Sequence, residues 1–164
     1  MLKLSDVNGL SAEEFVRVFA PVFERSPWIA ARAEARRPFA SSVELHAALR
    51  AVVQHASSAE KLALICAHPD LVGNAVLTAE SQGEQASAGL SSLTPAEAAR
   101  FRDYNERYRT RFAFPFVICA RLHKKEAILR AFSERLENSR EKEIETALAE
   151  IYKIADLRLR DLIE

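Results

Sequence analysis

Residues 57–70 read SSAEKLALICAHPD, and this stretch shows how the chain builds its helices. Ser57 and Glu60 have the spacing of a capping box, in which each side chain binds the backbone N–H of the other residue at a helix start. Apolar residues then recur at helical intervals until Pro69, whose ring does not fit a continuing helix. The stretch therefore predicts a short capped helix that ends at His68.

The same start signals recur along the whole chain. Further capping-box serines and threonines stand at Ser11, Ser41 and Thr94, and prolines suited to a first helical position follow Ser26 and Thr94. Stripes of apolar residues at helical spacing follow these starts, and Pro21 is expected to interrupt the first long one. We therefore predict an all-α fold, a single compact domain over residues 1–164 with about eight helices.

The segment Phe114–Ala120, with the sequence FPFVICA, departs from the helical pattern. Pro115 forbids a smooth helix, and the residues around it are aromatic or β-branched, types that favour an extended backbone. The segment contains no charged residue. It therefore predicts an extended, buried crossing between two helices.

Composition excludes several classes of function. The chain has 164 residues, with 23 Lys and Arg against 23 Asp and Glu, so no net charge attracts nucleic acid or an anionic membrane. No apolar run approaches the ~20 residues that span a bilayer. Cys66 and Cys119 have apolar neighbours and are expected to be buried thiols in a reducing compartment. Neither a secretion signal nor a C-terminal peroxisomal signal is recognisable, so we expect a cytoplasmic protein.

Two polar clusters interrupt the apolar helices. His68 stands where a helix must stop, and Ser81, Glu84 and Gln85 stand at i, i+3 and i+4, so on a helix all three point the same way. A histidine near physiological pKa, together with a carboxylate, an amide and a hydroxyl, suits the binding of a small polar ring and the transfer of a proton. Gly83 adds a residue that lets a ligand approach a helix closely.

Structural alternatives remain open for each of these positions. His68 could serve only as a helix C-terminal cap, Asp70 as a local turn residue, and Glu84 as a solvated helix glutamate. Arg158, on the last predicted helix, is either an arginine at the edge of a packed face or a guanidinium fork for a carboxylate or urea oxygen. Residues 140–145, REKEIE, indicate a solvated helix start. No His, Cys or carboxylate cluster has metal-ligand spacing, so no metal site is expected.

Several blocks of the sequence form a recognisable combination. They are His68-Pro69-Asp70-Leu71, Leu77–Ser81 leading into Glu84-Gln85 and Ala88-Gly89-Leu90, Asn105 with Tyr108 and Arg111-Phe112, Phe114–Ala120, and Lys153–Leu159. Together these blocks resemble the family of 2-oxo-4-hydroxy-4-carboxy-5-ureidoimidazoline (OHCU) decarboxylases. The resemblance runs from about Leu10 to Leu162, and the combination of blocks is highly specific. The stretch between Gly73 and Leu77 is shorter than is usual in the family, which affects the expected rim of the pocket.

The resemblance implies an enzyme of urate degradation that decarboxylates OHCU to (S)-allantoin. His68 would be the catalytic acid or base with Glu84 as its partner. The substrate would contact residues of three further groups: Pro69; Ser81, Gln82, Gly83 and Gln85; and Arg158. The main-chain groups of Phe116, Val117, Ile118, Cys119 and Ala120 would complete the pocket. The family further implies a homodimer, and its place in the pathway implies a functional link to urate oxidase and hydroxyisourate hydrolase.

The expected chemistry needs no cofactor. The carbon that carries the carboxylate adjoins a ring C=N bond, so the ring can accept the electron pair that carbon dioxide leaves behind. Two other interpretations use the same residues. One is a J-domain-like co-chaperone module built on His68-Pro69-Asp70, although Lys61 is the only basic residue of the preceding helix. The other is a helical protein that binds a ureide without turnover.

Overall fold

The computed structural model describes residues 1–164, and it confirms the all-α prediction with nine α-helices, two short 3-10 helices and no β-strand. The chain divides into two compact units. The first unit comprises residues 1–67 and 152–164, and the second comprises residues 68–151. The last helix, α9 (Arg140–Leu162), contributes its residues up to 151 to the second unit and the rest to the first. None of the helices is long and apolar enough to cross a membrane.

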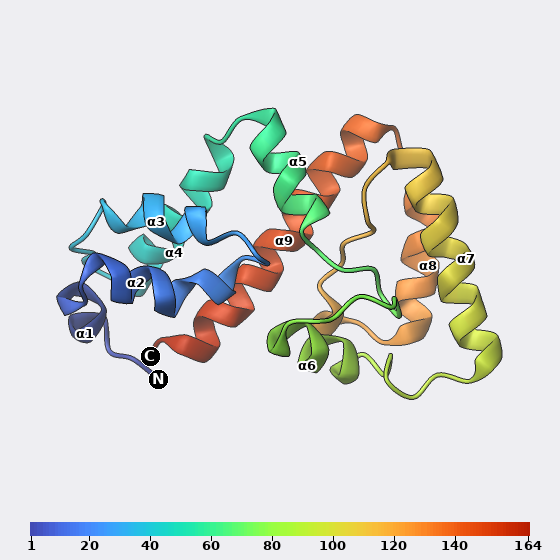
Figure 1. The fold of residues 1–164 in the computed structure, drawn as a ribbon, viewed down its shortest axis with the longest axis horizontal. Helices are drawn as coiled ribbons and strands as arrows, with labels where there is room; N and C mark the ends of the chain where they lie inside the picture. The colour runs from blue at the N-terminus through green and yellow to red at the C-terminus, as the bar shows by residue number, and fades with distance from the viewer. The chain divides into compact units, whose positions relative to one another are not determined.

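The first unit contains five short helices and the C-terminal turns of α9 (Figure 1). These helices are α1 (Leu4–Gly9), α2 (Ala12–Phe19), α3 (Pro27–Glu34), α4 (Ser42–Gln54) and α5 (Ser58–Cys66). The helix starts lie where the capping pattern predicts them, because Ser11, Ser41 and Ser57 each accept a hydrogen bond from the backbone N–H three residues later. Helix α2 ends at Phe19, just before the Pro21 that was expected to interrupt it.

The core of the first unit is apolar and partly aromatic. The Phe15 ring lies 4.6 Å from that of Phe19 and 6.2 Å from that of Phe39, measured between centroids. The backbone of Leu2 pairs with Leu162 and Glu164, which brings the two terminal segments side by side (Figure 1). This pairing ties the end of α9 to the beginning of the chain.

The second unit contains α6 (Ala79–Ser87), α7 (Pro95–Phe112), α8 (Lys125–Arg135) and the N-terminal part of α9. Thr94 caps α7, and Pro95 is its first residue, as the sequence predicts. After α7, the segment Phe114–Cys119 is non-helical, and Ala120 begins the short 3-10 helix Ala120–Leu122. Every residue of Phe114–Ala120 is buried, which confirms the predicted buried crossing (Figure 1). We call Phe116–Ala120 the crossing below.

Aromatic rings hold the crossing in the core of the second unit. The Phe116 ring stacks on that of Phe132 of α8 at 3.7 Å, and it meets the Tyr108 ring edge-on at 5.3 Å. Burial of side chains of this size contributes roughly 1.5–3 kcal/mol each to folding. The crossing is therefore a fixed part of the core, not a surface loop.

Two predictions about burial are wrong. Cys66 is exposed, because the buried residues of the short helix α5 are Leu64 and Ile65 and the thiol lies on another face; Cys119 is buried as expected. Within the supposedly solvated start of α9, Glu143 is fully buried. It shares one helix face with Ala147, Glu150 and Ile151, at spacings of four, seven and eight residues, and all four are buried.

Candidate active site

His68 is the first residue of the second unit, and it directly follows Ala67, the C-terminal cap of α5. Only 7% of its surface is exposed, whereas Pro69 and Asp70 beside it are half-buried. A histidine is one of the few side chains that can both accept and donate a proton near neutral pH. Its burial limits access to small molecules that enter the site.

The turn that follows His68, residues 70–72, is held by side chains from α6 and α7. Arg109 Nε lies 3.0 Å from both carboxylate oxygens of Asp70. Asn105 Nδ2 donates to the Leu71 carbonyl at 2.7 Å, and the Val72 N–H donates to Gln85 Oε1 at 3.2 Å. Asp70 is thus bound to a distant arginine, and each residue of the turn has its own anchor.

Val72 shows why the turn needs these anchors. Its φ angle of 55° lies in the left-handed region, which a β-branched residue rarely adopts. Such a conformation costs roughly 1–3 kcal/mol and persists only where the surroundings impose it. The hydrogen bond to Gln85 therefore links the strained turn directly to α6.

The face of α6 carries the predicted polar cluster. The helix begins at the cap residue Thr78, and Ser81 and Gln85 are buried at 5% and 9% exposure, with Glu84 half-buried between them. The prediction that these three residues share one face is confirmed. Gln82 and Gly83 are exposed on a different face, and a Cβ atom on Gly83 would meet no atom within 4 Å. Internal packing therefore does not require the glycine.

Two buried charged residues, from α8 and α9, bind the backbone of the crossing, and the sequence pattern did not predict either of them. Arg135 Nη1 donates to the Val117 carbonyl at 2.7 Å, and the Cys119 N–H donates to Glu150 Oε2 at 2.9 Å. The guanidinium of Arg135 also lies 4.2 Å from the centre of the Phe116 ring. Arg135 and Glu150 are each 8% exposed.

Arg135 belongs to a wider buried network centred on Glu143. The Glu143 carboxylate receives hydrogen bonds from Arg135 Nε at 3.0 Å, from Asn138 Nδ2 at 2.9 Å and from the Tyr108 hydroxyl. Burial, and next the bond to Glu143, raise the pKa of the Tyr108 phenol well above its ordinary value. Tyr108 therefore stays protonated and acts as a donor.

Arg158 belongs to the first unit, where it is buried rather than at the edge of a packed face. Its Nη1 donates to the Pro21 carbonyl at 2.8 Å, and its Nη2 lies 3.0 Å from Glu24 Oε2, a carboxylate that is also buried. The guanidinium is therefore held in a fixed orientation, as the fork interpretation requires.

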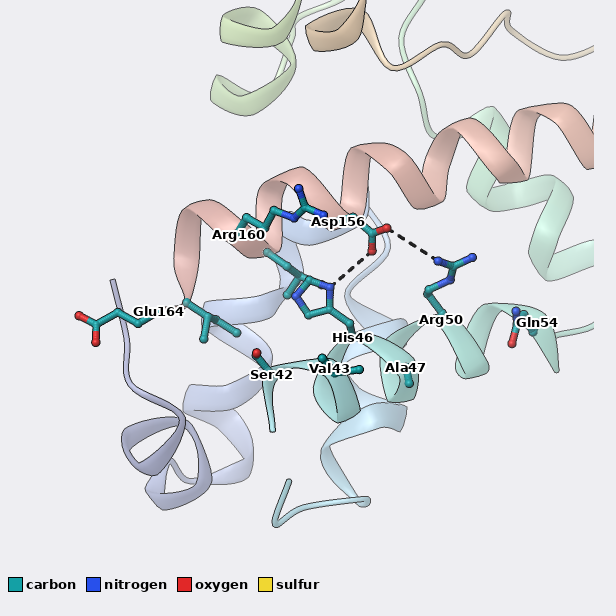
Figure 2. A pocket seen from close by; sticks show the side chains of 11 residues that line it. Ser42, Val43, His46, Ala47, Arg50, Gln54, Asp156, Arg160 and Glu164 are labelled. Atoms are coloured by element: carbon teal, nitrogen blue, oxygen red, sulfur yellow. Dashed lines mark ion pairs between the residues drawn. The ribbon is translucent and has the colours of Figure 1, made fainter. Parts of the chain in front are cut away.

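A pocket of about 640 Å³ also lies in the first unit, between α4 and the end of α9 (Figure 2). Figure 2 shows the Asp156 carboxylate between His46 and Arg50, with His46 Nδ1 at 3.5 Å and Arg50 Nη1 at 3.7 Å. This group of three residues was not predicted from the sequence, because the two helices are far apart in the chain. No predicted site residue lines this pocket. No group of three or more His, Cys, Asp or Glu side chains could hold a metal ion.

The structure thus brings most of the predicted site residues into one unit. His68, the α6 face and the crossing all belong to residues 68–151, and Gln85 on α6 binds Val72 of the turn that follows His68. The supporting residues Asn105, Arg109, Arg135 and Glu150 were not predicted as such. Asn105 had a signal, since it stands in one of the family's blocks.

The sequence matches the family model described as OHCU decarboxylase over residues 8–160. The chain belongs to the OHCU decarboxylase family. It is 44% identical to the 2-oxo-4-hydroxy-4-carboxy-5-ureidoimidazoline decarboxylase of Amia calva over 167 residues, which cover 99% of this chain and 95% of that protein. The enzyme of the same name from Haloferax volcanii is 42% identical, with 98% and 95% covered.

Two solved structures and a longer relative are also similar to this chain. The crystal structure of (S)-allantoin synthase covers 100% of this chain and 54% of its own, with a TM-score of 0.83 and 29% identity. An OHCU decarboxylase crystallised in the presence of (S)-allantoin has the same fold, with a TM-score of 0.73 and 24% identity, covering 92% of this chain and 96% of its own. A uric acid degradation bifunctional protein of Bacillus sp. is 41% identical over 99% of this chain and 32% of its own length.

Proposed function

We propose that the protein decarboxylates OHCU to (S)-allantoin, with His68 as the acid or base that handles the proton. The observation that carries the assignment of His68 is its burial next to a strained turn that three side chains fix in place. A turn of this kind holds the imidazole where a small ring can meet it. The decarboxylase names of relatives 44% and 42% identical to this chain support the reaction.

The reaction breaks the bond between the ring carbon and its carboxylate. The electron pair of that bond moves toward the adjoining C=N, so that carbon dioxide leaves and an enol-type ring remains. A proton then adds to the neighbouring carbon, which carries the ureido group, and the ring hydroxyl becomes a carbonyl. One proton is taken up overall, and its delivery to a single face of the ring gives a single enantiomer. Such general acid–base catalysis is worth ~10²–10⁴-fold in rate.

The remaining site residues would hold the substrate. Glu84 would accept hydrogen bonds from a urea-like edge, while Ser81 and Gln85 would bind ring and ureido groups. Pro69, Gln82, Gly83 and the main chain of the crossing would complete the contacts. We assign Arg158 to a ring or ureido oxygen, because a tight pair with the departing carboxylate would stabilise the ground state and slow the step.

We further propose that residues 1–164 act as one OHCU decarboxylase domain, in a cytoplasmic homodimer that works without a cofactor. The enzyme would take its substrate from the steps of urate oxidase and hydroxyisourate hydrolase. The bifunctional relative of Bacillus sp. supports that link, because its name joins a homologous region to uric acid degradation.

The test couples the protein to freshly generated urate oxidation product and follows allantoin by circular dichroism. The wild-type protein should yield (S)-allantoin faster than the spontaneous reaction and as one enantiomer. His68→Ala should abolish this acceleration while the helical signal is retained. A racemic product at the uncatalysed rate from the wild type would refute the proposal, and would favour a protein that only binds a ureide.

A matched pair of variants on α6 tests the assignment of Glu84. Glu84→Gln keeps the size of the side chain and removes its charge, so it should reduce activity strongly. Glu80→Gln makes the same change at an exposed position of the same helix and should have little effect. Equal effects of the two substitutions would contradict a role for Glu84 in the site and would indicate an ordinary surface glutamate.

A further inference from the structure

The crossing poses a problem of hydrogen bonding. It is buried and has no neighbouring strand, and buried backbone N–H and C=O groups need partners. Two of its backbone groups have charged side chains as partners. The Val117 carbonyl accepts a hydrogen bond from Arg135, and the Cys119 N–H donates one to Glu150. Hydrogen bonds to ionised groups are about twice as strong as neutral ones. The crossing is therefore fixed at two points, one on each side of Ile118.

The two anchors define one edge of the crossing. In an extended chain, the N–H and C=O of one residue point to the same edge, and those of the next residue point to the opposite edge. The Val117 carbonyl and the Cys119 N–H thus point toward Arg135 and Glu150, and the N–H and C=O of Ile118 between them point the other way. The Cys119 carbonyl accepts a hydrogen bond from the Leu122 N–H at the start of the next turn. No hydrogen bond within the protein involves the N–H or C=O of Ile118. These groups stay available to a ligand.

Arg135 is itself held in one orientation. Its Nε and Nη2 lie 3.0 Å and 2.9 Å from Glu143 Oε2, which leaves Nη1 directed at the Val117 carbonyl. A guanidinium is a rigid planar fork, so fixing one side of it also fixes the other. The network of Glu143 therefore sets the position of the crossing through Arg135.

We propose that Arg135 and Glu150 are positioning residues that present the N–H and C=O of Ile118 to the urea-like edge of the substrate. The inference rests on the proposed function, and among the five residues of the crossing it selects Ile118, which lies between the two anchored peptide groups. A ureido group offers N–H donors next to a carbonyl acceptor, which matches the single donor and single acceptor of Ile118. Glu150 and Arg135 do not touch the substrate; they act through the backbone.

Two variants of Glu150 separate position from charge. Glu150→Asp keeps the charge but withdraws the acceptor oxygen by one methylene, whereas Glu150→Gln keeps an acceptor oxygen in place and removes the charge. We expect Glu150→Asp to raise KM by about 10-fold with kcat within about 3-fold, because a contact that binds substrate and transition state alike affects KM. We expect Glu150→Gln to stay within about 3-fold of the wild type in both constants. Glu145→Asp, at an exposed position of the same helix, is the matched control and should change neither.

Amide measurements by NMR give a second readout that does not depend on turnover. Hydrogen exchange at the Cys119 amide should be about 10-fold faster in Glu150→Asp than in the wild type, and unchanged in Glu150→Gln. Added (S)-allantoin should shift the Ile118 amide resonance of the wild type, a measurement that needs no variant to fold.

The outcomes distinguish this inference from the proposed function. A wild type that makes no (S)-allantoin refutes the function, while the exchange rate at Cys119 still shows whether Glu150 holds the crossing. An active wild type in which Glu150→Asp and Glu150→Gln behave alike refutes the inference alone. An Ile118 amide that does not respond to saturating (S)-allantoin overturns it as well.

Discussion

The turn at residues 70–72 and the residues 116–119 of the crossing are both non-helical, and both are held by side chains of neighbouring helices, but the ion pairs that hold them differ in burial. In the turn, the side chains of Arg109 and Asp70 are 49% and 27% exposed. Behind the crossing, those of Arg135 and Glu143 are 9% and 0% exposed. Exposed ion pairs contribute little, whereas breaking a buried one leaves an uncompensated charge. The ion pair behind the crossing should therefore contribute more to stability than the ion pair of the turn.

The largest effect should come from Arg135. Arg135→Met removes the only cation that pairs with the buried Glu143 carboxylate and the donor to the Val117 carbonyl, and it should lower the free energy of unfolding by about 3–5 kcal/mol. Urea denaturation followed by circular dichroism measures the change. A loss below about 1 kcal/mol would mean that the buried network is not what holds the crossing.

A smaller loss is expected at one of the two buried anchors of the turn, Asn105. Asn105→Ala removes the donor to the Leu71 carbonyl and should cost about 1–3 kcal/mol. It should also reduce kcat/KM, because the turn that follows His68 loses a constraint. Asn74→Ala, at an exposed position of the same connection, is the control for both measurements. Unchanged kinetics in Asn105→Ala would show that the other two anchors suffice.

The phenol of Tyr108 should make the crossing's network sensitive to high pH. Its pKa is raised in the folded protein, so the folded state keeps a proton that the unfolded chain releases above its ordinary value of 10.0. Stability is therefore fully present below about pH 10 and falls above it, by up to about 1.4 kcal/mol per pH unit. Tyr108→Phe should unfold with a shallower pH dependence in this range. Identical slopes would contradict the burial of the phenol.

The smallest effect should come from the exposed pair of the turn. Arg109→Met should change the free energy of unfolding by less than about 1 kcal/mol, and the change should shrink further at high salt. Chemical denaturation at low and high salt tests this directly. A loss as large as that of Arg135→Met would contradict the expected difference between the exposed ion pair of the turn and the buried ion pair behind the crossing.

The sequence predicted the local features of the fold well. Helix starts such as Ser57 and Thr94 depend on residues three positions apart, and Pro115 with its aromatic neighbours fixed the crossing for equally local reasons. The shared face of Ser81 and Gln85 followed from helical geometry alone.

Features that depend on distant partners were not predictable in this way. Glu143 was assigned to a solvated helix start and Glu150 was not singled out, because their partners Arg135 and the Cys119 N–H lie in other elements. Only the spacing that they share with Ala147 gave a sign of a buried face. The predicted burial of Cys66 was wrong for a related reason, since a helix as short as α5 has too few turns to assign each residue to a face.

The unequal exposure of the two cysteines gives the protein an internal measure of how often the crossing opens. Cys66 is exposed, so a thiol reagent modifies it at the rate of an ordinary surface cysteine. Cys119 lies within the crossing at 1% exposure and reacts only when the crossing opens locally. The ratio of the two labelling rates in a single unmodified sample therefore reports the free energy of local opening of the crossing.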